Sequence, residues 1–225
     1  MGNLRIISRV STPFSGRIEA GKLLLESVRD IASSKSVILG IPRGGIVIAN
    51  EVARGLCAEF DIVLSRKIGA PSNLEFAIGA VSEDGNVFIN EEALRQENIS
   101  KNYIEREKNR QIREMRLRAE AYRRIKQKVV LFGKTVVICD DGVATGATMQ
   151  AAVWAIWQEK PERIVLALPV APYDTLKKLA EEVDEVVCLR VPDFFTAVGQ
   201  FYMDFPQVED SEVIELLKEI QSVKK

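Results

Sequence analysis

Short apolar runs alternate with longer amphipathic stretches along most of the chain. The runs have the length and the β-branched content of buried strands, and they lie at 37–39, 62–64, 135–139, 164–168 and 186–190. In the stretches between them, apolar residues recur at helical spacing at 16–33, 46–56, 147–159 and 173–183. Strands that alternate with helices of this length need crossover connections. We therefore expect an α/β fold with a mainly parallel, twisted sheet and helices on both of its faces.

The pattern changes in the middle of the chain. Two further apolar runs, 77–82 and 87–89, flank Asp84-Gly85, a dipeptide typical of hairpin turns. The segment 91–128 is then long, polar and free of glycine, and its apolar residues recur at helical spacing, at Ile112, Met115, Ala119 and Tyr122. We expect one domain over residues 1–225, with a helical insertion at 91–128 that lies on the sheet or on a partner, and a small C-terminal hood at 191–225.

Composition and charge narrow the class of protein. A chain of 225 residues with 47% apolar and 28% charged residues is ordinary for a globular protein. Its net charge of −1 gives no overall attraction to nucleic acid or membrane, although basic residues outnumber acidic ones at 101–128. That segment is either a solvated helix face or an RNA-binding or subunit-contact helix. Without a secretory leader or a long apolar run, we expect a cytoplasmic protein that does not enter a membrane.

The residue types that carry chemistry are restricted. The chain has no histidine, the commonest general base and transition-metal ligand. Its three cysteines, Cys57, Cys139 and Cys188, are widely spaced in apolar patterns and are expected to be reduced and mostly buried. Catalysis must therefore rely on carboxylates, lysine, arginine, backbone donors or a hard ion such as Mg²⁺.

The segment 136–149 is the most informative part of the chain. An apolar strand ends at Cys139, Asp140 and Asp141 follow it, and a Gly/Thr turn leads into a helix. Backbone N–H groups of 144–148 would converge at the start of that helix, where the partial positive charge favours a phosphate, and the hydroxyls of Thr145 and Thr148 would add donors. The two carboxylates are suited to ribose hydroxyls or a hard cation. The segment therefore predicts a phosphate and sugar site.

The pattern Asp-Asp-Gly-x-Ala-Thr-Gly-Ala-Thr in this segment resembles the phosphoribosyl diphosphate (PRPP) loop of type I phosphoribosyltransferases. It lacks the lysine of a nucleotide phosphate loop and the glycine spacing of a dinucleotide-binding fingerprint. The resemblance implies that PRPP binds to Asp140, Asp141, Gly142, Ala144, Thr145, Gly146, Ala147 and Thr148. It also implies a Mg²⁺ cofactor near Asp140, Asp141 and the later Asp204.

The loop Gly40-Ile41-Pro42-Arg43-Gly44-Gly45 resembles the pyrophosphate loop of the same family. Two glycines allow the backbone to approach a ligand, Arg43 supplies positive charge, and the helix that follows adds its N-terminal dipole. Arg43 and Gly44 are therefore candidate pyrophosphate ligands. The resemblance also implies a cis peptide at Pro42-Arg43 or Arg43-Gly44.

A third element, from Ser65 to Gly79, is similar to a shortened mobile loop of adenine phosphoribosyltransferases. By that resemblance, Arg66 and Lys67 approach the pyrophosphate, in the same or a neighbouring subunit, and Glu75 accepts or lends a proton. Lys67, Glu75 and Arg43 are thus the candidate catalytic residues. Hypoxanthine-guanine enzymes carry an aspartate where this chain has Ala144, so Glu75 or solvent must do that work, or the substrate is not a 6-oxopurine.

The segment 192–205 resembles the base-binding part of purine transferases, which makes Phe194 and Phe195 candidate stacking residues, although an aromatic plug of the core would have the same composition. Almost the whole chain resembles a group of phosphoribosyltransferases whose acceptor base is not settled. The resemblance implies a Mg²⁺-dependent phosphoribosyltransferase that converts PRPP and a nitrogenous base, with a purine favoured, to a nucleoside 5′-monophosphate and pyrophosphate. A homodimer is expected.

Two other classes stay open. One is a PRPP or nucleotide sensor on the same fold, which the basic helix favours and which the short segment before the first strand, about 35 residues, disfavours because a DNA-binding domain needs more. The other is a nucleotide-dependent hydrolase, which the missing phosphate-loop lysine disfavours.

Overall fold

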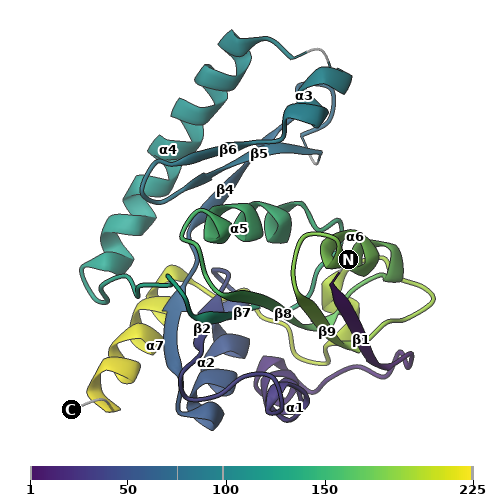
Figure 1. The fold of residues 1–225 in the computed structure, drawn as a ribbon. Coiled ribbons are helices and arrows are strands. Elements are labelled where there is room, and N and C mark those ends of the chain that lie inside the picture. The colour runs from purple at the N-terminus through teal and green to yellow at the C-terminus, as the bar shows by residue number, and fades with distance from the viewer. Residues whose placement is uncertain (1, 75, 98, 224–225) are drawn as a thin grey trace.

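The computed structural model describes residues 2–74, 76–97 and 99–223. The body of the molecule is a six-stranded sheet in the order β1-β9-β8-β7-β2-β3 (Figure 1). Its strands are β1 (Asn3–Ser8), β2 (Val37–Gly40), β3 (Glu59–Ile62), β7 (Thr135–Cys139), β8 (Arg163–Val170) and β9 (Glu185–Arg190). Every pairing in this sheet is parallel, which confirms the fold class predicted from the apolar pattern.

Helices cover both faces of the sheet. On one face, α1 (Arg17–Val28) packs against α2 (Gly45–Leu56), and on the other lie α5 (Ala147–Trp157) and α6 (Tyr173–Ala180). The side chains of each strand alternate between these layers, so that Ile38 joins the apolar cluster of α1 and α2 while Val37 and Leu39 join the cluster of α5 and α6. The continuous apolar runs in the sequence therefore reflect burial on two sides.

The chain turns in opposite directions after the two central strands. From β7 it passes through α5 to β8, whereas from the neighbouring β2 it passes through α2 to β3. The two connections consequently lead away in opposite directions from the carboxyl ends of these strands. Such a switch point is where open α/β sheets bind ligands.

A second sheet and two helices form an arm, here residues 65–123, that rises from the body (Figure 1). The strands β4 (Ser65–Gly69), β5 (Ala77–Ser82) and β6 (Val87–Ile89) are antiparallel, and α3 (Glu91–Glu97) and α4 (Lys101–Arg123) follow them. The sheet packs on α5 on one side and on α4 on the other. The predicted hairpin at 77–89 is confirmed. The arm, however, begins before the insertion expected at 91–128.

The amino-terminal segment differs from the sequence prediction. The expectation of about 35 residues before the first strand is wrong, because β1 begins at Asn3 and pairs with β9 at the edge of the sheet. As an edge strand it is only half-buried, so its sequence lacks the continuous apolar run of the central strands. The strand expected at 62–64 also ends earlier, at Ile62.

The carboxyl-terminal segment crosses the body after β9. It contains a short 3₁₀ helix, η1 (Val198–Phe201), and ends in α7 (Asp210–Val223), which contacts α4 and α2. No helix in the described ranges is both long and apolar enough to span a membrane.

Candidate active site

The loops after β2 and β7 meet at the switch point. Gly40 and Cys139, the last residues of the two strands, are aligned, and the N–H of Ile41 donates to the carbonyl of Cys139 at 3.0 Å. A Cβ atom at Gly44 would lie 1.9 Å from Oδ2 of Asp141, and one at Gly45 would lie 2.8 Å from Cα of Asp140. Glycine at both positions is thus required for the two loops to touch. The Pro42–Arg43 peptide is cis, as the resemblance implies.

Asp140 and Asp141 lie side by side where β7 ends. The N–H of Asp141 donates to Oδ1 of Asp140 at 2.9 Å. Burial, and then the charge of Asp141, raises the pKa of Asp140 well above its usual range. Burial also raises the pKa of Asp141, although the hydrogen bond from Arg17 acts in the opposite direction. Two half-buried carboxylates with one nearby cation make a site that a further positive charge would stabilise.

Arg17 is a site residue that the sequence pattern does not reveal as such. Its Nε donates to Oδ2 of Asp141 at 2.8 Å, and its side chain is 9% exposed. A signal was nevertheless present, because Arg17 is the first residue of α1 and a cation is unfavourable at the start of a helix unless a partner compensates. Tyr202, also unrecognised, donates its hydroxyl to the carbonyl of Asp141 at 2.5 Å.

We call Asp140 and Asp141 the acidic pair. The turn that follows this pair is held by hydrogen bonds to residues of α6 and β8. The N–H of Val143 donates to the carbonyl of Val170 at 3.0 Å, and Oγ1 of Thr175 donates to the carbonyl of Ala144 at 2.7 Å. Gly146 has a φ of +86° and precedes α5 without giving it a side-chain cap. The first-turn N–H groups of α5 therefore keep their capacity to bind an anion.

Other residues named from the sequence lie on or beside the same turn. Thr145 and Thr148 are exposed, as is Ala144, and all three lie on this turn or on the first turn of α5. Gly142 fits because a Cβ there would lie 2.6 Å from Cγ1 of Val198. The turn is thus held by hydrogen bonds with β8 and α6, while residues 144, 145 and 148 are exposed to solvent.

Arg66 and Lys67, the two basic residues of β4, lie on opposite faces of the arm's sheet. Lys67 is aligned with Ala80, which packs with Ala147 at the start of α5, so Lys67 lies on the sheet face that looks toward the start of α5. Arg66 lies on the opposite face, where it pairs with Glu114 of α4 at 3.6 Å. Glu75 lies outside the described residues.

Arg43 extends from the first loop toward the carboxyl-terminal segment. Its Nη1 pairs with Oε2 of Glu209 at 3.1 Å, and the side chain of Glu209 is 57% exposed. The guanidinium of Arg43 is therefore engaged by a solvent-exposed carboxylate of the carboxyl-terminal segment.

The aromatic and acidic residues of the tail are spread out. Phe194 is 88% exposed, whereas Phe195 packs on Phe201 with 5.2 Å between ring centroids. Asp204 is exposed and its N–H donates to the carbonyl of Ser15. In the described residues, Asp204 does not join Asp140 and Asp141 in a metal-binding group of three. A cation at this site would therefore be held by the acidic pair.

The acidic pair itself fits a hard cation. It offers carboxylate oxygens, the ligands that Mg²⁺ prefers. Mg²⁺ usually takes one or two carboxylates and completes its shell with water and substrate phosphates, so two protein ligands are sufficient.

A family model, two relatives of known sequence and a solved structure are similar to this chain over most of its length. Residues 16–206 match the model of the phosphoribosyl transferase domain. The chain is 39% identical over 204 residues to two Mycobacterium tuberculosis proteins, from strains CDC 1551 and H37Rv, that are provisionally named phosphoribosyl transferases. The match covers 91% of this chain and 46% of theirs, so the chain spans about half the length of these relatives. The crystal structure of the protein TT1426 from Thermus thermophilus is similar over 92% of this chain and 99% of that one, with 47% identity and a TM-score of 0.88.

Proposed function

The chain belongs to the type I phosphoribosyltransferase family, and we propose that it transfers the phosphoribosyl group of PRPP to a nitrogenous base. The products would be a nucleoside 5′-monophosphate and pyrophosphate. The main support is the acidic pair at the switch point, which has an uncapped helix N-terminus on one side and a glycine loop on the other. PRPP has a matching sequence of groups: a 5′-phosphate, two ribose hydroxyls and a pyrophosphate.

Each part of the site then has a role in binding. The 5′-phosphate would accept hydrogen bonds from the N–H groups of 144–148 and from the hydroxyls of Thr145 and Thr148. The ribose hydroxyls would donate to Asp140 and Asp141. The backbone of 43–45 and the N-terminus of α2 would bind the pyrophosphate. Fixing both ends of PRPP holds C1′ in place for the incoming base.

The chemical step separates charge. As the bond from C1′ to pyrophosphate breaks, positive charge develops on the ribose ring and negative charge on the leaving oxygen. Arg43 and Lys67 would stabilise the leaving group, provided that Arg43 exchanges Glu209 for pyrophosphate. When bound to Asp140 and Asp141, Mg²⁺ would neutralise further charge on the pyrophosphate. Because Ala144 carries no base, the proton of the acceptor would pass to Glu75 or to solvent.

The tail supports a flat acceptor. Phe194 follows the strand β9 and exposes its ring, so that it can stack on a heterocycle. We favour a purine, because the tail resembles purine transferases and Ala144 resembles the adenine branch of the family.

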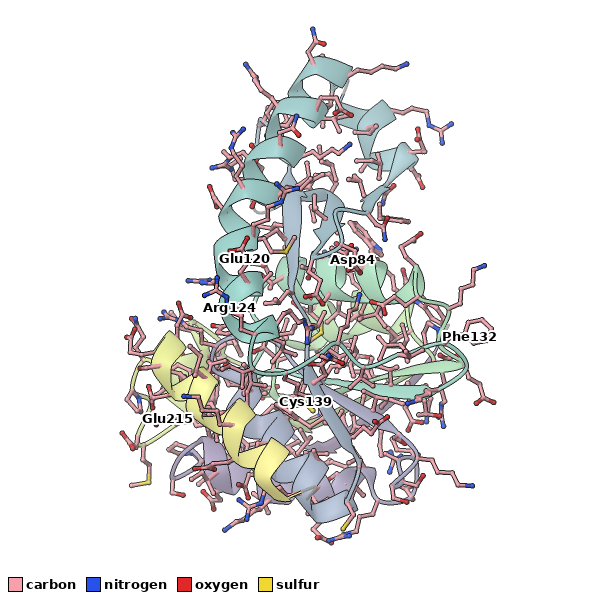
Figure 2. All side chains as sticks on the ribbon, turned by 90° about the vertical axis from the view of Figure 1, so that its left-hand side faces the viewer. Asp84, Glu120, Arg124, Phe132, Cys139 and Glu215 are labelled. Carbon is pink, nitrogen blue, oxygen red and sulfur yellow. The ribbon has the colours of Figure 1, made fainter. Side chains whose placement is uncertain are left out.

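Calorimetry of PRPP binding tests the site. With saturating Mg²⁺, the variant Asp140→Asn/Asp141→Asn should bind PRPP about a hundredfold more weakly than the parent protein, since charge-assisted hydrogen bonds and a cation are lost together. The control is Glu215→Gln on α7, an exposed residue away from the switch point (Figure 2). Equal affinity in the acidic-pair variant and the control would remove PRPP from this site.

A further inference from the structure

A chain of stacked aromatic and guanidinium groups runs from the carboxyl-terminal segment to the acidic pair. We call residues 202–206 the strap. The ring of Phe205 stacks on Tyr202 with 4.8 Å between centroids, and the guanidinium of Arg17 lies 3.8 Å from the centroid of Phe205. Tyr202 in turn packs on Phe14 with 5.4 Å between centroids. The strap is therefore packed into the body beside Asp141.

Arg17 joins the strap to Asp141 through three contacts. Its Nε donates to Oδ2 of Asp141 and its Nη1 donates to the carbonyl of Pro206, both at 2.8 Å, and its planar face covers Phe205. A second link between the strap and Asp141 is the hydrogen bond that the hydroxyl of Tyr202 donates to the carbonyl of Asp141. A planar group with several donors in fixed directions can make these contacts together, whereas an ammonium group cannot.

The contacts leave the acidic pair ordered and partly available. In the described part of the chain, hydrogen bonds to the two carboxylates engage Oδ2 of Asp141, from Arg17, and Oδ1 of Asp140, from the N–H of Asp141. These two hydrogen bonds do not use Oδ2 of Asp140 or Oδ1 of Asp141. Of these two carboxylates, Arg17 contacts that of Asp141, and the contact is to Oδ2.

We propose that Arg17 is a positioning residue for PRPP, which acts through Asp141 and is itself held by Phe205 and Pro206 of the strap. This inference rests on the proposed function, because it assumes that PRPP binds at the acidic pair. Arg17 is the first residue of α1, where the helix dipole disfavours a cation. The contact to the acidic pair compensates for that position.

A double-mutant cycle separates positioning from folding. PRPP affinity is measured by calorimetry with saturating Mg²⁺ for the parent protein, Arg17→Gln, Asp141→Asn and Arg17→Gln/Asp141→Asn, and circular dichroism establishes that each is folded. We expect Arg17→Gln to weaken binding about tenfold in the parent and by less than about threefold when Asp141 is already asparagine, because contacting residues are not additive. Equal effects in both backgrounds would overturn the proposal.

Two further variants keep the test informative. Arg17→Lys retains the charge but not the three contacts, so we expect its affinity to lie nearer to Arg17→Gln than to the parent; parent-like binding would overturn positioning in favour of charge alone. Arg163→Gln is the control, because Arg163 also pairs with a buried carboxylate, Glu185, but at the opposite ends of the strands. If the parent protein itself does not bind PRPP, the proposed function fails; if the parent binds and Arg17→Gln binds equally, only this inference fails.

Discussion

Arg17 and Asp141 are 124 positions apart in the chain, yet their side chains meet at 2.8 Å in a half-buried ion pair. The acidic pair after β7 is therefore completed by the first residue of α1 and covered by the segment that follows η1. Residues from both ends of the chain determine the geometry of a site whose motif lies in one short segment.

Residues 142–146 form the turn that leads into α5, where we propose that the 5′-phosphate binds. Gly146→Ala should weaken PRPP binding about tenfold, because Gly146 has a φ of +86° and a Cβ there would lie 3.0 Å from Cγ2 of Thr175. Gly133→Ala is a matched control, since Gly133 has a φ of +66° with open space around it. Both variants should lose about 1 kcal/mol of unfolding free energy in urea titrations. Equal loss of PRPP affinity in both would contradict the placement of the phosphate.

Glu209 pairs an exposed carboxylate with the guanidinium of Arg43. Glu209→Gln removes a competitor for pyrophosphate, so affinity for pyrophosphate should rise, by about threefold, because exposed ion pairs contribute at most about 1 kcal/mol. The gain should shrink at high salt. Calorimetry with pyrophosphate at two ionic strengths measures both effects, and weaker binding by the variant would show that Glu209 assists the site.

The third prediction concerns the base of the arm. Arg123 bridges Asp61 and Glu83 at 2.7 Å each, and the side chains of these two residues are only 2% and 9% exposed. Arg123→Gln leaves them without this partner, so the unfolding free energy should fall by about 3 kcal/mol. The control is the next residue, Arg124→Gln, whose side chain is exposed (Figure 2) and whose loss should change stability by less than about 0.5 kcal/mol. Similar urea midpoints for the two variants would argue against a structural role for the Arg123 network.

The fourth prediction concerns thiol reactivity. Cys57 is exposed, whereas Cys139 and Cys188 are buried, and Figure 2 shows Cys139 within the body. Burial raises the pKa of Cys188 to about 12 and that of Cys139 further, so both remain protonated near pH 8. With a disulfide reagent, one thiol per chain, that of Cys57, should react in the native state, and all three should react in urea. Rapid reaction of two thiols in the native state would contradict the burial of Cys139 and Cys188.

The same shifts predict a loss of stability in alkali. A thiol whose pKa is raised by folding keeps its proton in the native state while the unfolded chain releases its own. The contribution is complete below the unfolded pKa, near 8.5, and declines as the pH rises toward about 12. Urea titrations across this range should therefore show a falling free energy of unfolding.

The parts of the molecule that follow from the sequence are those with local signals. The central strands and their helices are visible because burial on two faces produces continuous apolar runs, and the loops at 40–45 and 140–148 are visible because glycines and charges lie at fixed offsets from strand ends. The cis peptide at Pro42–Arg43 follows from resemblance rather than from any local physical signal.

The parts that the sequence does not reveal depend on contacts between distant segments. The strand β1 is an edge strand and needs only part of an apolar pattern, and β4 is short and carries Arg66 and Lys67 within it. The sequence pattern does not distinguish Arg17 as a site residue; its role is visible only from its contacts with Asp141 and Phe205 in the structure. Tertiary partners, which no local pattern encodes, define these elements.

The most direct test is a transfer assay with PRPP, Mg²⁺ and, one at a time, adenine, guanine, hypoxanthine, xanthine, uracil and orotate, in which pyrophosphate and nucleotide are measured. We predict base-dependent release of both products with at least one base, a purine in preference, and its loss in Asp140→Asn/Asp141→Asn. Absence of turnover with every base would contradict the proposed transfer, and PRPP binding without turnover would favour a nucleotide sensor on the same fold.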